Sequence, residues 1–246
     1  AKALITNQFN SITMENQMKP ESLLSKENQT RGTDTNVLIN EEILQKVLKL
    51  ASDNGLKLRG HTLVWHSQTP EWFFHKDYNV DKSLVSKDVM RQRMESYIKK
   101  VLTYCQENYP GVVYAWDVVN EAVNGNTYRD DKVISDASDT STSDTRHGSN
   151  SMWWRVYESN EFIINAFKYA NKYAPNDVEL YYNDFGETDN TKCEGIVKLI
   201  NDVKSADGTR LDAFGMQAHY NVDGFSAAQF KSVAKKYAAA AGKVQL

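Results

Sequence analysis

The chain has 246 residues, of which 41% are hydrophobic and 25% are charged, as is usual for a soluble globular protein. This length is enough for one large domain. The formal net charge of −3, without any continuous stripe of Lys and Arg, argues against binding to nucleic acids or anionic membranes. No apolar run approaches the roughly 20 residues of a membrane-spanning helix, and no secretory signal peptide is recognisable.

Short β-rich runs alternate with longer amphipathic stretches along the chain. Residues 1–8 resemble the end of a helix, and strands are predicted at 9–13, 56–65, 112–119, 178–184, 211–219 and 243–246. Helices are predicted between them at 41–54, 88–108, 153–174, 193–206 and 227–241. Apolar residues of the second helix recur at steps of three and four, which indicates one buried face. Such sustained alternation predicts βα units and a parallel sheet.

Two arrangements of a parallel sheet are possible, an open doubly wound sheet and a closed barrel. No glycine-rich phosphate loop follows any predicted strand, which argues against the nucleotide-binding open sheet. Polar residues instead collect at the C-terminal ends of the strands, where barrel enzymes place their active sites. These residues are Glu15, His61, Glu121, Asp184 and His219. The pattern favours a barrel.

The predicted elements are too few for a complete barrel. Six strands and five full helices are recognisable, whereas a (β/α)8 barrel has eight of each. We therefore predict a single but incomplete (β/α)8 TIM barrel domain over residues 1–246, with its first and eighth strands missing. The segments that would close this barrel are expected elsewhere, as further sequence or as a separate piece.

The sequence offers weak candidates for a disulfide and for a calcium-binding loop, and neither is expected to be real. Cys105 and Cys193 lie in different predicted helices with a complete strand–helix unit between them, so we expect no disulfide, and the redox compartment stays open. Residues 135–151 are rich in Ser, Thr and Asp, but they lack the Gly and Glu that a calcium loop needs at its sixth and twelfth positions. We predict a solvated surface loop there.

Glu121 ends the apolar run "AWDVVNEA" and should project from a strand tip towards the barrel mouth. A carboxyl enclosed by aromatic side chains can hold a proton near neutral pH and donate it. The alternative is an acid at a helix start or a structural salt bridge. The motif alone does not decide between the two.

The other strand tips carry hydrogen-bonding groups and aromatic faces, which suit an uncharged, polyhydroxylated ligand such as a sugar chain. These residues are Glu15, Asn16, Lys19, His61, Trp65, His66, Gln68, Tyr182, Asn183, Asp184, Gln217 and His219. A zinc site is the rival use of His61 and His66, but the sequence has no H-E-x-x-H motif and no third ligand at a recognisable spacing. No metal or cofactor is expected.

Five motifs, "SITMENQMKPE", "GHTLVWHSQTPEW", "WDVVNEA", "YYNDF" and "GMQAHY", stand in an order and spacing that resemble glycoside hydrolase family 10. The resemblance extends over essentially the whole chain. It implies a retaining endo-β-1,4-xylanase with an open cleft, which binds xylan and xylo-oligosaccharides and hydrolyses the xylan backbone without a cofactor. It also implies a secreted, extracellular enzyme that acts as a monomer.

The resemblance implies a role for each matching residue. Glu121 corresponds to the general acid/base, and Asn120 to the residue that binds the sugar 2-hydroxyl beside the scissile bond. Glu15, Asn16 and Lys19 correspond to residues that hold xylosyl units on the non-reducing side.

The remaining matches surround the bond that is cleaved. His61, Trp65 and Gln68 shape the adjacent sugar site. Tyr182 corresponds to an aromatic residue near the leaving group. Gln217 and His219 correspond to a pair that orients the nucleophile and the reactive sugar.

The chain departs from the family in its second carboxylate. A retaining glycosidase needs two carboxylates about 5–5.5 Å apart, and the nucleophile is expected just beyond Leu246, so the chain would be truncated before it. Three other carboxylates lie near strand ends. Glu15 is expected to bind sugar, Asp117 should pair within the barrel, and Asp184 lies on the strand next to that of Glu121, so none of them is expected to replace the nucleophile. Three hypotheses follow: part of a working xylanase, a non-catalytic xylan-binding fragment, or a hydrolase of another β-1,4-glycan such as cellulose or mixed-linkage glucan.

Overall fold

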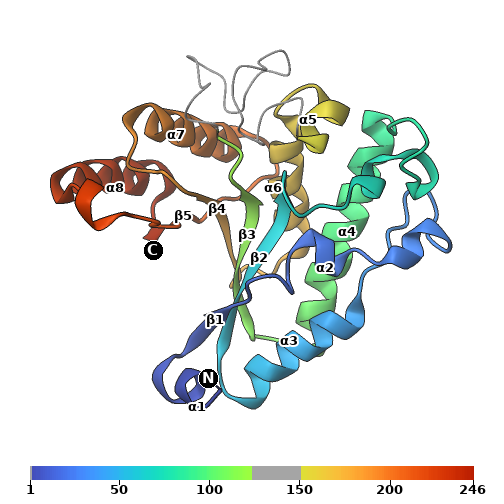
Figure 1. Cartoon of the computed structure of the whole chain (residues 1–246), viewed down its shortest axis with the longest axis horizontal. Coiled ribbons are helices and arrows are strands. Elements are labelled where there is room, and N and C mark those ends of the chain that lie inside the picture. The colour runs from blue at the N-terminus through green and yellow to red at the C-terminus, as the bar shows by residue number, and fades with distance from the viewer. Residues whose placement is uncertain (1, 124–150) are drawn as a thin grey trace.

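The computed structural model describes residues 2–123 and 151–246, in which six parallel strands form one sheet in chain order. All six predicted strands are confirmed, and the sheet curls as expected for an incomplete (β/α)8 barrel (Figure 1). Because all the strands are parallel, their C-terminal ends lie along one rim. The strands are β1 (Ser11–Thr13), β2 (Lys57–Trp65), β3 (Val113–Asn120), β4 (Glu179–Asp184), β5 (Ala213–Met216) and β6 (Val244–Gln245).

The helices pack around the outer face of the sheet (Figure 1). Those that connect consecutive strands are α3 (Glu41–Asp53), α4 (Lys87–Asn108), α5 (Met152–Tyr157), α6 (Glu161–Tyr173), α7 (Asn190–Ser205) and α8 (Ala227–Ala241). The shorter helices are α1 (Lys2–Gln8), α2 (Pro20–Leu23) and the 3-10 turns η1 (Lys26–Gln29), η2 (Glu71–Phe74), η3 (Lys76–Tyr78) and η4 (Val222–Gly224). The helix expected from residues 1–8 is thus confirmed, whereas α2 and the 3-10 turns were not predicted.

Side-chain caps explain where most of these helices begin. Asn40, Ser86, Asp189 and Ser226 each accept a hydrogen bond from the backbone amide three residues later, at the starts of α3, α4, α7 and α8. The prediction of one helix over 153–174 is wrong, because Glu158 adopts a left-handed conformation (φ 50°) and ends α5 before α6 begins. A left-handed residue closes a helix and redirects the chain.

Strand alternation divides the buried residues into two layers. The larger core lies between the sheet and the helices and contains Trp116, Leu180 and Tyr182. A small cluster of Ala115, Tyr181 and Ala213 occupies the inner face of the curled sheet. The inner face therefore keeps room for polar side chains, which form the candidate site.

Other expectations have mixed outcomes. Cys105 and Cys193 are buried free thiols. Residues 135–150 of the expected surface loop lie outside the described residues, whereas Ser151 is buried and caps α5. None of the helices within 2–123 and 151–246 combines the length and the apolar character needed to cross a bilayer.

Candidate active site

Glu121 follows the last residue of β3, and both of its carboxylate oxygens accept hydrogen bonds from side chains at the ends of β2 and β5. The indole Nε1 of Trp65, at the end of β2, donates to Oε2 at 2.9 Å. The Nε2 of Gln217, just after β5, donates to Oε1 at 2.9 Å. Because both donors are neutral, these contacts orient the carboxylate without forming the structural salt bridge considered above.

A polar network on the inner face of the sheet fixes Asn120, the neighbour of Glu121. The Arg59 guanidinium donates to Oδ1 of Asp117 through Nε (3.0 Å) and Nη2 (2.6 Å), and Nη2 also donates to Oδ1 of Asn183 at 3.0 Å. Since an arginine can only donate, the Nδ2 of Asn183 faces Asn120 and donates to its Oδ1 at 2.8 Å. The Asn120 amide is therefore oriented by a chain of contacts that starts at a permanent cation.

Asp117 holds two partners at once. Its Oδ1 accepts from Arg59, and its Oδ2 lies 2.8 Å from Nδ1 of His61. Its side chain is only 2% exposed. The expectation that Asp117 pairs within the barrel is confirmed, and this pairing also holds the imidazole ring of His61 close to Trp65, with 6.3 Å between ring centroids.

Three predicted sugar-site residues, Asn16, Lys19 and Gln68, form a second cluster beside Trp65. The Lys19 Nζ donates to Oδ1 of Asn16 at 3.1 Å and to Oε1 of Gln68 at 2.8 Å. The Gln68 Nε2 donates to Oδ1 of Asn16 at 3.2 Å. The same ammonium lies 5.1 Å from the centroid of the Trp65 ring, within cation–π range. The structure thus brings Asn16, Lys19, Trp65 and Gln68 together.

Two predicted residues lie more loosely on the same rim. Glu15 is exposed in the bend after β1, and His219 is exposed beyond β5. The predicted strand 211–219 is too long, because β5 ends at Met216 and Ala218 adopts a left-handed conformation (φ 55°). The Ala218 amide is held there by Oε1 of Glu187 at 2.8 Å.

Tyr182 lies elsewhere than predicted. Strand alternation directs its side chain towards the helices, where it is fully buried and stacks against Phe214. Its hydroxyl accepts hydrogen bonds from the amides of Ala122 and Val123. Tyr182 therefore supports the tip of β3 from behind, and the half-buried aromatic residue of the same motif at the rim is Phe185.

Sequence reasoning missed Arg59 and Lys192. For Arg59 the available signal was a charged residue inside an apolar strand, since a buried charge must be paired. Lys192 lies in the first turn of α7, where a lysine gives no such signal. Gly215 gave a weaker signal: a Cβ there would lie 2.3 Å from the Arg59 Nη2, so glycine leaves the space that the guanidinium fills.

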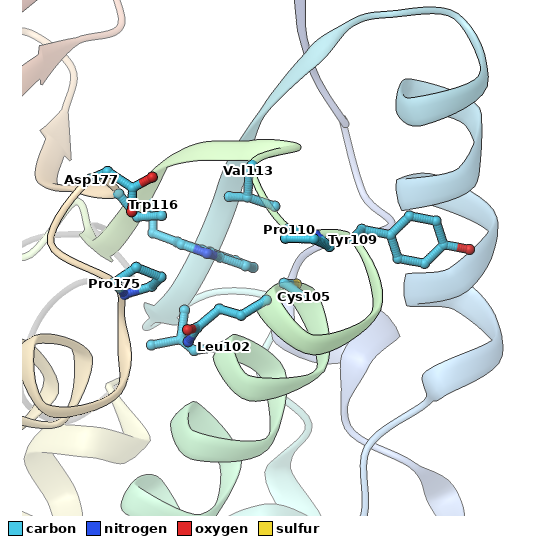
Figure 2. Close-up of a pocket in the computed structure, with 11 residues that line it drawn as sticks. Leu102, Cys105, Tyr109, Pro110, Val113, Trp116, Pro175 and Asp177 are labelled. Atoms are coloured by element: carbon cyan, nitrogen blue, oxygen red, sulfur yellow. The ribbon is translucent and has the colours of Figure 1, made fainter.

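A cavity of about 270 Å³ lies at the opposite end of β3. Its lining is mostly apolar and includes Val113 and Trp116 of β3, Cys105 of α4 and Pro175 of the loop before β4 (Figure 2). None of the polar strand-tip residues reaches it. Among the described residues, no group of three or more His, Cys, Asp or Glu is arranged to hold a metal ion. The polar rim is therefore the candidate site.

Comparison with known proteins gives one family. The model of glycosyl hydrolase family 10 matches residues 1–246. Endo-1,4-beta-xylanase Y of Acetivibrio thermocellus is 41% identical over 240 residues, which are 96% of this chain and 21% of that protein. The bifunctional endo-1,4-beta-xylanase XylA of Ruminococcus flavefaciens is 36% identical over 240 residues, 97% of this chain and 23% of that protein. The chain thus spans about a fifth of these relatives.

Solved structures agree. The N-terminal CBM22-1 and GH10 modules of Clostridium thermocellum endo-1,4-beta-D-xylanase 10B, crystallised with xylohexaose, match with a TM-score of 0.85 and 37% identity over 100% of this chain and 47% of that one. A psychrophilic family 10 endo-beta-1,4-xylanase matches with a TM-score of 0.76 and 33% identity, over 99% of this chain and 67% of that one.

Proposed function

The chain belongs to glycosyl hydrolase family 10, as its five motifs predicted, and from this we propose that its protein hydrolyses internal β-1,4-xylosidic bonds of xylan with retention of configuration. The observation that carries the proposal is the carboxylate of Glu121. Trp65 and Gln217 hold it at the rim where the parallel strands end, the position at which barrel enzymes carry out catalysis.

Glu121 acts twice in the proposed reaction. In the first step it protonates the glycosidic oxygen as a nucleophilic carboxylate attacks the anomeric carbon, so that the C–O bond breaks and a glycosyl-enzyme ester forms. In the second step the Glu121 carboxylate takes a proton from water, the water oxygen attacks the anomeric carbon, and the nucleophile leaves.

The nucleophile is proposed to follow Leu246 in the whole protein, close to β6. The other carboxylates near Glu121 are engaged within the fold, Asp117 with Arg59 and His61, and Asp184 with Lys192. A group at the C-terminal end of β6 would enter the rim beside β5, the strand that precedes Gln217.

Sugar recognition is assigned to the remaining rim residues. The amide of Asn120 is proposed to contact the 2-hydroxyl of the reactive sugar, and the polar cluster of Asn16, Lys19 and Gln68 is proposed to hold the adjacent units. Trp65 offers an aromatic face beside them. Glu15, His61 and His219 complete the proposed contacts.

Membership of the same family also suggests the domain organisation, location and oligomeric state of the protein. We propose that residues 1–246 belong to one catalytic domain, which acts outside the cell as a monomer on xylan and xylo-oligosaccharides. Non-catalytic xylan binding and hydrolysis of another β-1,4-glycan are the alternatives. The relatives named above are described as xylanases, and one was crystallised with xylohexaose, which favours xylan hydrolysis.

Glu121→Gln, made in the whole protein, tests the acid/base role. General acid catalysis is worth about 10²–10⁴-fold, so the rate of xylan cleavage should fall by about that factor. An activated aryl xylobioside, whose leaving group needs no proton, should lose far less in the glycosylation step. Comparable losses on both substrates would mean that Glu121 has a structural role instead.

A further inference from the structure

The backbone at Glu121 adopts a conformation that the chain must enforce. Glu121 has a φ of 55°, in the left-handed region that residues other than glycine rarely adopt. Such strain persists only where the surroundings hold it. The groups that fix residues 121–123 therefore also decide where the Glu121 carboxylate lies.

Strand β4 supplies these groups. The amide of Glu121 donates to the backbone oxygen of Asn183 at 2.9 Å. The next two amides, of Ala122 and Val123, both donate to the hydroxyl oxygen of Tyr182, at 3.0 and 3.1 Å. One phenol oxygen thus holds both peptide groups that follow Glu121.

The hydroxyl of Tyr182 is itself fixed from behind. It donates its proton to Oδ2 of Asp184, and Oδ1 of Asp184 lies 2.8 Å from Nζ of Lys192. A hydroxyl has one donor and two acceptor sites, so all of its hydrogen-bonding capacity is used. The side chains of Asp184 and Lys192 are 0% and 4% exposed, so this ion pair is shielded from water.

The chemistry of the phenol suits a permanent support. Burial and the neighbouring Asp184 carboxylate raise the pKa of Tyr182 well above its usual value. The phenol therefore keeps its proton, and the orientation of its oxygen, at every pH at which such an enzyme would act. Stacking on Phe214, with 5.9 Å between centroids and 23° between planes, fixes the ring.

We propose that Tyr182, anchored by the buried Asp184–Lys192 pair, is a positioning residue that holds the Glu121 carboxylate between Trp65 and Gln217. The inference rests on the acid/base role proposed for Glu121 and adds a residue that acts on it through the backbone. Tyr182 is buried and touches no substrate. A misplacement of a catalytic group by about 1 Å can lower the rate by about 10²-fold. Loss of the Tyr182 hydroxyl should therefore lower the catalytic rate.

Tyr182→Phe in the whole protein tests this inference, because it removes the hydroxyl and keeps the ring. We expect kcat on xylan to fall by about 10- to 100-fold with little change in KM, while the glycosylation rate on an activated aryl xylobioside falls much less. The matched control is Tyr181→Phe, the preceding residue on β4, whose hydroxyl contacts Glu179 and Gln245 instead. This control should keep the wild-type ratio of the two rates.

A purely structural role would give a different result. Fewer folded molecules would lower both rates equally, so an equal loss, or no loss, overturns the proposal. Should Tyr182→Phe not fold, the double variant Asp184→Asn/Lys192→Met carries the same comparison, because it weakens the acceptor of the phenol proton, keeps the phenol and leaves no buried charge unpaired.

A crystal structure of Tyr182→Phe separates this proposal from the proposed function. If the wild-type protein does not cleave xylan, the proposed function fails. The positioning role of Tyr182 is tested separately, because it predicts that the contact from Nε1 of Trp65 to Oε2 of Glu121 is lost in the Tyr182→Phe structure. An unchanged contact would overturn it.

Discussion

Arg59 is the residue around which the polar interior is organised. Its guanidinium is 11% exposed and contacts both Asp117 and Asn183, and it lies over the ring of Tyr181 at 4.9 Å from the centroid. A charge removed from water in this way needs a well-placed counter-ion. The same counter-ion, Asp117, also contacts His61. One buried ion pair therefore orients a histidine and, through Asn183, the amide of Asn120.

Asp117→Asn should be strongly destabilising. It leaves the Arg59 guanidinium without its counter-ion, and breaking a buried pair in this way costs on the order of 3–5 kcal/mol. Chemical denaturation of the whole protein measures the change. The control is Glu42→Gln, which breaks an exposed pair with Lys46 on α3 and should have no measurable effect. Equal, small effects of the two variants would contradict the importance given to Arg59.

At the scale of elements, irregular strand pairing brings polar side chains of β3 onto one face of the sheet. The pairing of β3 with β4 shifts between Asp117 and Val119, as does that of β2 with β3 between His61 and Val64. A bulge changes which face the following side chains point to. Asp117 and Asn120 therefore join the same inner network although they are three residues apart.

This irregularity marks the limit of what the sequence could predict. Apolar periodicity located every strand and the long helices, because burial of one face dictates it. It did not reveal the shifted register of β3, the break at Glu158 or the left-handed Ala218, which depend on tertiary contacts. Tyr182 was misplaced for a simpler reason, since a strict alternation along β4 puts Tyr181 and Asn183, and not Tyr182, on the inner face.

Gly215→Ala tests the fit between β5 and this network. A Cβ at this position would lie 2.3 Å from Nη2 of Arg59 and 2.5 Å from Oδ1 of Asn183. Overpacking of this kind costs about 1–3 kcal/mol, and it should also slow xylan cleavage by displacing Asn183 from Asn120. Thermal unfolding and initial rates measure both effects.

Gly224→Ala is the matched control, because nothing lies within 4 Å of a Cβ there. It should leave both quantities unchanged. If Gly215→Ala behaved in the same way, the packing around Arg59 would be looser than described.

At the scale of the whole molecule, the curled sheet gathers its chemistry at one rim. The parallel strands bring Trp65 and Gln217, which are 152 positions apart in the chain, onto the same carboxylate of Glu121. The barrel class and the rim were predictable, because polar residues follow nearly every strand and five motifs match one family. The contacts that turn these residues into a site, such as Trp65 and Gln217 on Glu121, required the structure.

The initial rate of reducing-sugar release from xylan, compared with that from carboxymethylcellulose, tests the central claim most directly. The whole protein that contains this chain should release reducing ends from xylan much faster than from the glucan, and Glu121→Gln should abolish most of that activity. Preference for carboxymethylcellulose would contradict the substrate assignment. Binding to xylan without any release of reducing ends would contradict the proposal that the protein is a xylanase.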